Sequence, residues 1–423
     1  MQFAPYRRVL ALPGVRALLA LSLFARIPVL AGSMVLTLHV VIDLKLGFGA
    51  AGAVFSASIL GSAIGSPWLG RFTDRYGLRP IVIFGTVAAA VFWGSAGFMS
   101  YPVLLVAGFV SSLIQIPVFT LSRQGLAALV PEEQRRPAYS LDSMAVELSY
   151  MAGPSIGVLV VTAFSAQAAI WAVFVGVIAN GVAFSLLNPP LRSEAESGTP
   201  SVRMPLRTWL RPGIVAVLLT VAGATLILGA TEVVVVAVLK QAGELSWASV
   251  VLIAWGIYSM TGGLVYGGLR RAPGPGVLML LLGLTTIALA VAGSWIWLCV
   301  ALIPAGLLCA PTLAGAADAM SRLAPAAVRG EAMGYYGSAM AVGMALGSPF
   351  AGAAVDLVGP AWGFVLAGAG GAVVAGVALL VERLGRRDLA GLAPAVPAAS
   401  ALALAASAPA ASRPAPASAA VGQ

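Results

Sequence analysis

Four charged residues stand inside long, mostly apolar stretches of the sequence, and they are the first candidates for a functional site. They are Arg26, Arg123, Glu147 and Glu232. A charge at the centre of an apolar membrane helix costs roughly 2.5–3.5 kcal/mol on insertion scales, so it needs a partner or a function. A buried carboxylate can carry a proton, and a buried guanidinium group can neutralise a carboxylate or attract an anion.

The spacing of Arg123 and Glu147 predicts an ion pair. Arg123 precedes Arg135 by twelve residues, and Glu147 follows it by twelve. Because the flanking helices are antiparallel neighbours that rise about 1.5 Å per residue, the two groups should lie at a similar depth. One interpretation is proton coupling, in which Glu147 takes up a proton in one state and returns to Arg123 in another. The alternative is a permanent structural pair, together with Asp74 and Asp142.

Arg26 and Glu232 each allow more than one role. Arg26 lies about 18 Å along the first apolar segment if that segment is helical. It can attract an anionic group of a substrate, serve as a counter-ion to Glu147, or stabilise structure alone. Glu232 lies deep in the seventh segment. It can recognise a cationic substrate, carry a proton, or line an outer vestibule.

Uncharged polar and aromatic residues can line a cavity beside these charges. Gln115, followed by Pro117, places an amide in the middle of an apolar segment. Aromatic side chains fall within two later segments, where they line a cavity or simply pack in the core: Trp255, Tyr258, Tyr335 and Tyr336.

The sequence lacks the residues that ATP binding or metal binding would require. The sequence has no G-x-x-x-x-G-K-[ST] loop for ATP and no His/Cys/Asp cluster for a metal. The single histidine, His39, is either a proton relay or a solvated residue at a segment end. Cys299 and Cys309 are about three helical turns apart, too far to form a disulfide, and we interpret them as packing residues. We therefore expect no enzyme activity, no cofactor and no metal.

The segments that must position these residues are membrane helices. Of the 423 residues, 60% are hydrophobic and 9% are charged, whereas a soluble domain is about 25% charged. Lipid must therefore cover much of the surface, and helices satisfy the backbone there. The sequence predicts twelve spans, at residues 14–42, 48–69, 80–98, 102–128, 139–163, 167–187, 212–238, 247–269, 275–293, 295–319, 332–357 and 360–381.

The distribution of positive charge predicts the orientation. Of the 24 Lys and Arg residues, all except Arg26, Lys45 and Lys240 fall on one side of this arrangement. By the positive-inside rule that side is the cytoplasm, and both termini lie there. The net charge of +9 is thus explained without a nucleic-acid partner.

A charged run at residues 70–80 lies between the second and third spans. Gly70 permits close helix approach, and Gly77 can take a positive φ that reverses the chain. Three arginines flank Asp74, and we expect them to hold it in a local ion network: Arg71, Arg75 and Arg79. The run resembles the cytoplasmic signature of the major facilitator superfamily, through Gly70, Asp74, Arg75, Gly77 and Arg79. The resemblance implies a loop that governs conformational switching.

Two further motifs extend the resemblance. Residues 121–125, Leu-Ser-Arg-Gln-Gly, are similar to the span-four signature of the superfamily, with a shorter spacing from Arg to Gly. Residues 153–157, Gly-Pro-Ser-Ile-Gly, resemble the span-five signature of its antiporters, although Ser140, Ser149 and Val158 replace glycines of that pattern. The glycines and prolines of this motif and of its later repeat predict helix bends, unless they reflect ordinary membrane-helix composition: Gly153, Pro154, Gly157, Gly347 and Pro349.

The two halves of the chain resemble each other. Pro131 and Arg135 recur as Pro325 and Arg329, although Arg271 stands where the second copy would have Asp74. Duplicated six-span halves imply a pseudo-two-fold axis along the membrane normal, with a site between the halves. The predicted organisation is a bundle at 1–187, a cytoplasmic linker at 188–211, a second bundle at 212–387 and a disordered Ala/Pro-rich tail at 388–423.

The sequence therefore predicts an all-α integral membrane protein of the major facilitator type, with twelve helices in two pseudo-symmetric bundles. By resemblance, its expected function is proton-coupled efflux of small amphipathic molecules, such as drugs or secondary metabolites, through alternating access. The expected setting is a bacterial inner membrane, with the protein as a monomer and with protons, lipid and a small-molecule substrate as partners. The alternatives are a nutrient uptake permease of the same fold and a membrane sensor or scaffold that transports nothing.

Overall fold

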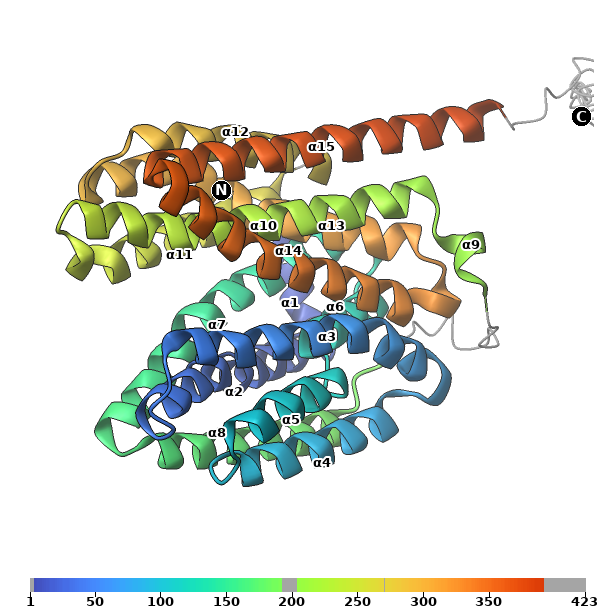
Figure 1. The fold of residues 1–423 in the computed structure, drawn as a ribbon. Helices are drawn as coiled ribbons and strands as arrows, with labels where there is room; N and C mark the ends of the chain where they lie inside the picture. The colour runs from blue at the N-terminus through green and yellow to red at the C-terminus, as the bar shows by residue number, and fades with distance from the viewer. Residues whose placement is uncertain (1–3, 192–203, 270, 392–423) are drawn as a thin grey trace, which may run out of the picture.

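A computed structural model of the protein describes residues 4–191, 204–269 and 271–391, where the regular structure is helical. The helices form two bundles, which lie one above the other in Figure 1. The first bundle contains α1 (Ala4–Ala11), α2 (Val15–Ile42), α3 (Phe48–Tyr76), α4 (Leu78–Ala96), α5 (Tyr101–Leu113), α6 (Val118–Leu129), α7 (Arg135–Ala163) and α8 (Ala166–Leu187). The second contains α9 (Leu206–Trp209), α10 (Pro212–Gln241), α11 (Ala248–Gly268), α12 (Pro275–Ile287), α13 (Trp295–Leu323), α14 (Arg329–Val358) and α15 (Pro360–Gly391).

The described residues account for the twelve predicted spans. Eleven helical segments there are long and apolar enough to cross a membrane, and Pro275–Val291 is a shorter apolar helix at the place of the ninth predicted span. Large hydrophobic side chains such as Phe24, Val91 and Leu159 are more than 60% exposed, as expected for surfaces that contact lipid. The predicted fold class is confirmed.

The two bundles repeat the same packing contacts. In the first, Gly65 of α3 lies against the backbone carbonyl of Leu113 on α5, so closely that a β-carbon would collide with it. In the second, Gly262 of α11 lies against the carbonyl of Leu307 on α13 in the same way. Small residues let membrane helices approach at such points. The repeated pair supports the predicted duplication of the halves.

The connections into α7 and α14 are also equivalent. Pro131 and Pro325 each precede a short 3₁₀ turn, at Glu132–Gln134 and Ala326–Val328. Arg135 and Arg329, which open the following helices, both have φ −62° and ψ −38°. The sequence match between these residues therefore reflects a repeated backbone conformation.

The predicted bend residues lie inside unbroken helices. Pro154 is within α7 and Pro349 is within α14. Gly153 and Gly157 pack closely on α2, and Gly347 packs closely on α10. Close packing of each helix on its neighbour is thus a sufficient reason for the glycines, and a bend at these positions stays a prediction.

The fourth span, predicted as one helix over 102–128, is interrupted in the structure. Its backbone leaves the helical path between α5 and α6, at Ile114–Pro117. Pro117 has no N–H group and disfavours a helical conformation of the residue before it, which explains the break. Gly85 of α4 permits the irregular backbone to approach. Gln115 therefore lies in an unwound segment in the middle of a span.

Three other boundaries differ from those predicted. Helix α3 continues to Tyr76, so the charged run occupies its last turns and Gly77 alone separates it from α4. Gly77 has φ +81°, as predicted for the chain reversal. Helix α15 extends to Gly391, whereas the span was expected to end at residue 381. Within the linker, α9 carries a buried Trp209, while residues 192–203 and the predicted tail from 392 onward lie outside the described residues.

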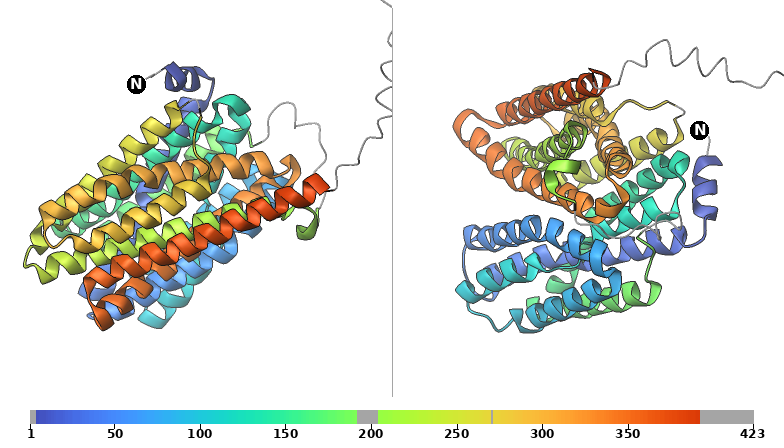
Figure 2. Two further views of the ribbon diagram at one scale, coloured as in Figure 1. Left: turned by 90° about the horizontal axis from the view of Figure 1, so that it is seen from above. Right: turned by 90° about the vertical axis from the view of Figure 1, so that its right-hand side faces the viewer.

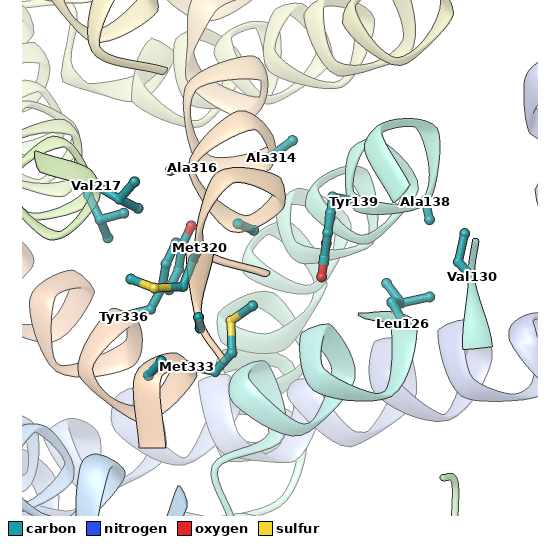
Figure 3. Close-up of a cluster of buried hydrophobic side chains, with 14 of the residues drawn as sticks. Leu126, Val130, Ala138, Tyr139, Val217, Ala314, Ala316, Met320, Met333 and Tyr336 are labelled. Atoms are coloured by element: carbon teal, nitrogen blue, oxygen red, sulfur yellow. The ribbon is translucent and has the colours of Figure 1, made fainter. Parts of the chain in front are cut away.

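The bundles meet mainly along α3 with α14 and α7 with α11 (Figures 1 and 2), and α13 also packs against α7 and α14 against α6. A hydrophobic cluster joins both bundles near the Gly77 end of the molecule, which we call the signature end. Figure 3 shows Leu126 and Tyr139 of the first bundle facing Met320, Met333 and Tyr336 of the second. The interface at the signature end is therefore packed like a protein core.

Candidate functional site

A buried ion cluster lies inside the first bundle and is centred on Asp142. The Arg26 Nη2 donates to Asp142 Oδ1 at 2.6 Å, and the Ser122 hydroxyl donates to the same oxygen at 2.6 Å. The Arg123 Nε lies 3.3 Å from Asp142 Oδ2. All three charged residues are at most 1% exposed, so these contacts are shielded from solvent.

The predicted ion pair between Arg123 and Glu147 is wrong, because Arg123 pairs with Asp142. The prediction counted equal numbers of residues on each side of Arg135. That count included the connection 130–134, where the chain reverses between α6 and α7 through a 3₁₀ turn and gains little depth. Counted from the facing helix ends, Arg123 of α6 matches Asp142 of α7, as observed. Arg26 likewise has Asp142 as its partner, which corrects the suggested role as counter-ion to Glu147.

The cluster holds two cations and one anion. Among the described residues, Nε and Nη1 of Arg26 and Nη2 of Arg123 have no hydrogen-bond partner. Arg26 lies 5.0 Å above the ring of Phe119, and Arg123 lies 4.5 Å above the ring of Tyr336. Aromatic faces stabilise such cations in part. Because Tyr336 belongs to α14, Arg123 also contacts the second bundle.

Glu147 lies at the contact between α7 and α11. The Ser259 hydroxyl of α11 donates to Glu147 Oε1 at 2.7 Å. On α7, Gly153 packs against α2, and Met151 packs against Gly256 of α11. With 3.6 residues per turn, Glu147 lies on the part of the α7 surface between the face that contacts α2 and the face that contacts α11. Its side chain is half-buried and points to the interior between the bundles.

Tyr150 and Glu232 complete this interior site from opposite bundles. Tyr150 lies one turn from Glu147 on α7, is 37% exposed, and has its ring centroid 6.4 Å from that of Phe119. Glu232 on α10 is exposed although it lies well inside a span. The charge of Glu147 interacts electrostatically with Glu232, and both carboxylates interact electrostatically with the Tyr150 hydroxyl. Two carboxyl groups, one from each bundle, therefore lie within electrostatic range of each other.

The other predicted cavity residues lie elsewhere. Trp255 is 8% exposed and packs with Tyr258 against Gly306 of α13, which is the core-packing alternative. Tyr335 lies 6.0 Å from Trp209, ring to ring, at the signature end. No prediction from the sequence concerned Phe119, Tyr150 or Ser259. The sequence suggested Asp142 only as part of a structural ion pair. The i, i+3 spacing of Glu147 and Tyr150 is the signal that could have found Tyr150.

Asp74 joins the two bundles at the signature end. Its Oδ1 accepts a hydrogen bond from the Gly330 N–H at 3.0 Å, and its Oδ2 accepts one from the Glu331 N–H at 2.9 Å. Gln124 also donates to Asp74 Oδ1, at 3.2 Å. The two backbone donors lie in the first turn of α14, where N–H groups lack helical partners and the helix dipole favours an anion. Gly70 lets α3 approach this turn, since a β-carbon there would collide with the Gly330 carbonyl.

The arginines near Asp74 have other partners, which corrects the expected local network. Arg71 pairs with Glu331 of α14 at 2.5 Å. Arg75 lies 5.2 Å from the ring centroid of Tyr76, and Arg79 donates to the Ser185 carbonyl at 3.3 Å. Asp74 and Arg71 therefore both contact the start of α14, so the charged run connects the bundles.

Helix α1 forms another connection at this end. The Tyr6 hydroxyl donates to the backbone carbonyl of Leu264 on α11, and it lies 3.4 Å from the Gly263 carbonyl. Tyr6 is 6% exposed, and burial raises its pKa to about 12, so its hydroxyl stays protonated at ordinary pH. Gly267 makes room for this hydroxyl. The chain before the first span is thereby tied to the opposite bundle.

Comparison with known families decides the identity of the fold. The sequence pattern of the Major Facilitator Superfamily matches residues 18–290 and 268–417, which is most of the chain. The chain belongs to the Major Facilitator Superfamily. As a member of this transporter family, it is a multi-pass membrane protein. No curated protein matches it in sequence.

Solved structures of similar fold are distant in sequence. The human organic anion transporter MFSD10 (TETRAN) is 18% identical, with TM-score 0.64 over 90% of this chain and 99% of that one. A bacterial homologue of the iron transporter ferroportin, in an outward-facing state, is 15% identical, with TM-score 0.68 over 89% and 100%. FucP, a Major Facilitator Superfamily transporter in the outward conformation, is 16% identical, with TM-score 0.63 over 88% and 98%. At these identities the similarity concerns the fold alone.

Proposed function

We propose that the protein exports small amphipathic molecules from a bacterial cytoplasm in exchange for protons. It would act as a monomer in the inner membrane, with both termini in the cytoplasm, by alternating access. The observation that carries the proposal is the pair of interior carboxyl groups, Glu147 and Glu232, placed on opposite bundles beside the ring of Tyr150.

Proton coupling requires a group whose affinity for a proton differs between the two transport states. Glu147 meets this requirement because its hydrogen-bond donor, Ser259, belongs to the other bundle. When the bundles separate at α7 and α11, that hydrogen bond is lost and the carboxylate is less stable. Proton release and uptake at Glu147 would then follow the movement of the bundles.

The contacts at the signature end suit one of the two transport states. The bonds from Asp74 and Arg71 to α14 hold that end closed. If it faces the cytoplasm, as the positive-inside rule predicts, the described state is outward-facing. Export then requires these contacts to break and re-form once per cycle.

The amphipathic substrate class follows from the surroundings of the carboxyl groups. The rings of Phe119 and Tyr150 lie 6.4 Å apart there, and the Tyr150 hydroxyl is within electrostatic range of both carboxylates. A sugar permease would need many neutral hydrogen-bonding groups in the same place. This contrast favours efflux of lipophilic compounds over nutrient uptake.

Accumulation of fluorescent amphiphiles in a drug-sensitive bacterial host tests the proposal. The panel should contain cationic, neutral and anionic compounds, each measured with and without a protonophore. Cells that express the protein should accumulate less of at least one compound, and the protonophore should abolish the difference. The variant Glu147→Gln should lose protonophore-sensitive export by about tenfold or more, equivalent to at least 1.4 kcal/mol.

Asp356→Asn, a change at an exposed carboxylate near the end of α14, is the matched control and should retain export. If protonophore-sensitive export persists at the normal rate in Glu147→Gln, Glu147 is not the coupling residue. If no compound of the panel is exported, the efflux proposal fails.

A further inference from the structure

The interior charges of the protein nearly cancel, and the remaining imbalance specifies a ligand charge. Within the ion cluster, Arg26 and Arg123 share a single anion, Asp142, which leaves one uncompensated positive charge. Glu147 and Glu232 supply two negative charges when both are ionised. The five groups together therefore carry one excess negative charge, and one added positive charge makes the interior neutral.

The exposed fractions show which of these groups a ligand can reach. Arg26 and Arg123 are at most 1% exposed, enclosed by Asp142 and by aromatic rings. Glu232 is exposed, Glu147 is half-buried, and Tyr150 is 37% exposed. A molecule in the interior therefore meets carboxylates and an aromatic ring, while the guanidinium groups lie behind them. This arrangement selects for a cation and against an anion.

The groups that face Glu147 come from four helices. They are Ser259 of α11, Tyr150 of α7, Glu232 of α10 and, within electrostatic range, the Cys309 thiol of α13. None of them is a cation. Arg26 and Arg123 interact electrostatically with the Tyr150 hydroxyl, but both guanidinium groups are buried in the ion cluster. A positive charge for the two carboxylates must therefore come from a proton or from a bound ligand.

We propose that Glu147 and Glu232 together bind either one proton or one monovalent organic cation, which makes the transporter an electroneutral one-for-one exchanger of amphipathic amines and protons. This inference rests on the proposed function and names its substrate class and stoichiometry. With one proton bound the interior is neutral, and with one monovalent cation bound it is neutral again. The empty and doubly loaded interiors each keep a net charge, which is costly away from water. The change between transport states is thereby restricted to the two neutral forms.

The placement of the carboxylates on opposite bundles gives the exchange its order. A cation held between Glu147 and Glu232 bridges α7 and α10, which belong to different bundles, whereas a proton binds to one of the two carboxylates. The bridge forms only when these helices are near each other and must break when they separate. Release of one ligand therefore precedes binding of the next, as exchange requires.

The test uses the full-length protein in liposomes of phosphatidylethanolamine and phosphatidylglycerol, with two matched probes. Ethidium is a monovalent aromatic cation, and propidium carries a second positive charge on the same ring system. An imposed pH gradient should drive ethidium movement, and a potassium diffusion potential set with valinomycin should leave the final ethidium gradient unchanged. Propidium should move at least about tenfold more slowly, because its second charge leaves the interior charged. Protein-free liposomes give the background leak of both probes.

Two variants complete the test. Glu232→Gln should lose pH-driven ethidium exchange by about tenfold or more, whereas Glu232→Asp should retain part of it because the charge remains. An ethidium gradient that responds to the diffusion potential would overturn the one-for-one stoichiometry. Export of neutral or anionic amphiphiles with no ethidium transport would overturn the amine class and leave the efflux proposal intact. Loss of pH-driven movement for every compound tested would instead overturn the efflux proposal itself.

Discussion

Asp142 is the residue on which the buried ion cluster depends. It accepts hydrogen bonds from Arg26 and Ser122 and pairs with Arg123, all inside the first bundle. Removing the only anion of such a group leaves cations buried without compensation, which costs about 3–5 kcal/mol. Asp142 therefore compensates the positive charge of two buried arginines.

A stability measurement checks this role. Asp142→Asn should lower the midpoint of thermal unfolding in detergent and reduce the yield of monodisperse protein, consistent with a loss of about 3–5 kcal/mol. Asp43→Asn is the matched control, since Asp43 pairs with His39 at a position that is 39% exposed, where a pair contributes about 0–1 kcal/mol. Equal unfolding midpoints for Asp142→Asn and the unaltered protein would show that the arginines are compensated in another way.

At this scale the sequence singled out the charged residues within the spans, but it did not predict their partners. Arg26, Arg123, Glu147 and Glu232 are recognisable because a charge among apolar residues is conspicuous. Their pairing depends on where α6 ends and α7 begins, and a shift of five residues transfers the partner from Glu147 to Asp142. Sequence patterns rarely define helix ends to better than a few residues, so the ion pairing could not be predicted from the sequence.

Between elements, the main connection is that from α3 to the first turn of α14. Asp74 accepts hydrogen bonds from two backbone N–H groups there, and Arg71 pairs with Glu331 in the same turn. An anion at a helix N-terminus contributes about 0.3–2 kcal/mol through the helix dipole, in addition to its hydrogen bonds. In the proposed alternating-access cycle, a connection of this size would bias the two states and would still break once per cycle.

Asp74→Asn should weaken this connection and slow transport, while the protein still reaches the membrane. The amide keeps one acceptor oxygen but loses the charge that the α14 dipole favours. A cysteine introduced at the signature end, in a background without Cys299 and Cys309, should react faster with a membrane-impermeant maleimide in the variant. Glu133→Gln, at an exposed carboxylate of the same end, serves as the control. Unchanged flux and unchanged labelling would remove Asp74 from the switching step.

The break between α5 and α6 shows a limit of sequence reasoning for elements. Pro117 marks the break, yet Pro28, Pro67, Pro154 and Pro349 all lie inside unbroken helices. Neighbouring helices can satisfy the backbone groups that a proline frees, so the outcome depends on packing. At Pro117 the irregular backbone packs closely on Gly85 of α4, a contact between distant parts of the chain that sequence patterns do not reveal.

For the whole molecule, the described contacts between bundles lie toward the signature end. They include Asp74 with α14, Arg322 with Glu132 at 2.6 Å, and Tyr6 with α11. Glu147 with Ser259 is farther along the same interface. The twelve spans, the two bundles and the duplication were predictable because hydropathy and repeats act over long stretches. The sequence could not predict which end of the interface is closed, because a transporter of alternating access uses one sequence for both transport states.

Tyr6→Phe tests the contribution of α1 to that closure. The ring still packs, but the hydrogen bond to the Leu264 carbonyl is lost. We expect the signature end to open more often, with faster labelling of a cysteine there by about two- to tenfold, as for the loss of one hydrogen bond worth about 0.5–1.5 kcal/mol. In the unaltered protein this contact should be fully present below pH 10 and lost as the pH rises through about 12, because the pKa of Tyr6 is raised. Labelling equal to that of the unaltered protein would show that α1 does not restrain the bundles.

The hydrogen bonds that Asp74 accepts from α14 come from main-chain groups, and this affects how the contact will look in an alignment of homologues. Gly330 and Glu331 present their main-chain N–H groups to Asp74, and a β-carbon at residue 330 would collide with the Asp74 carboxylate. These two hydrogen bonds involve no side chain of α14, so a side-chain change on α14 cannot restore them when Asp74 is replaced. We expect methods that infer contacts from correlated substitutions to miss these two hydrogen bonds, although they join the bundles at the signature end.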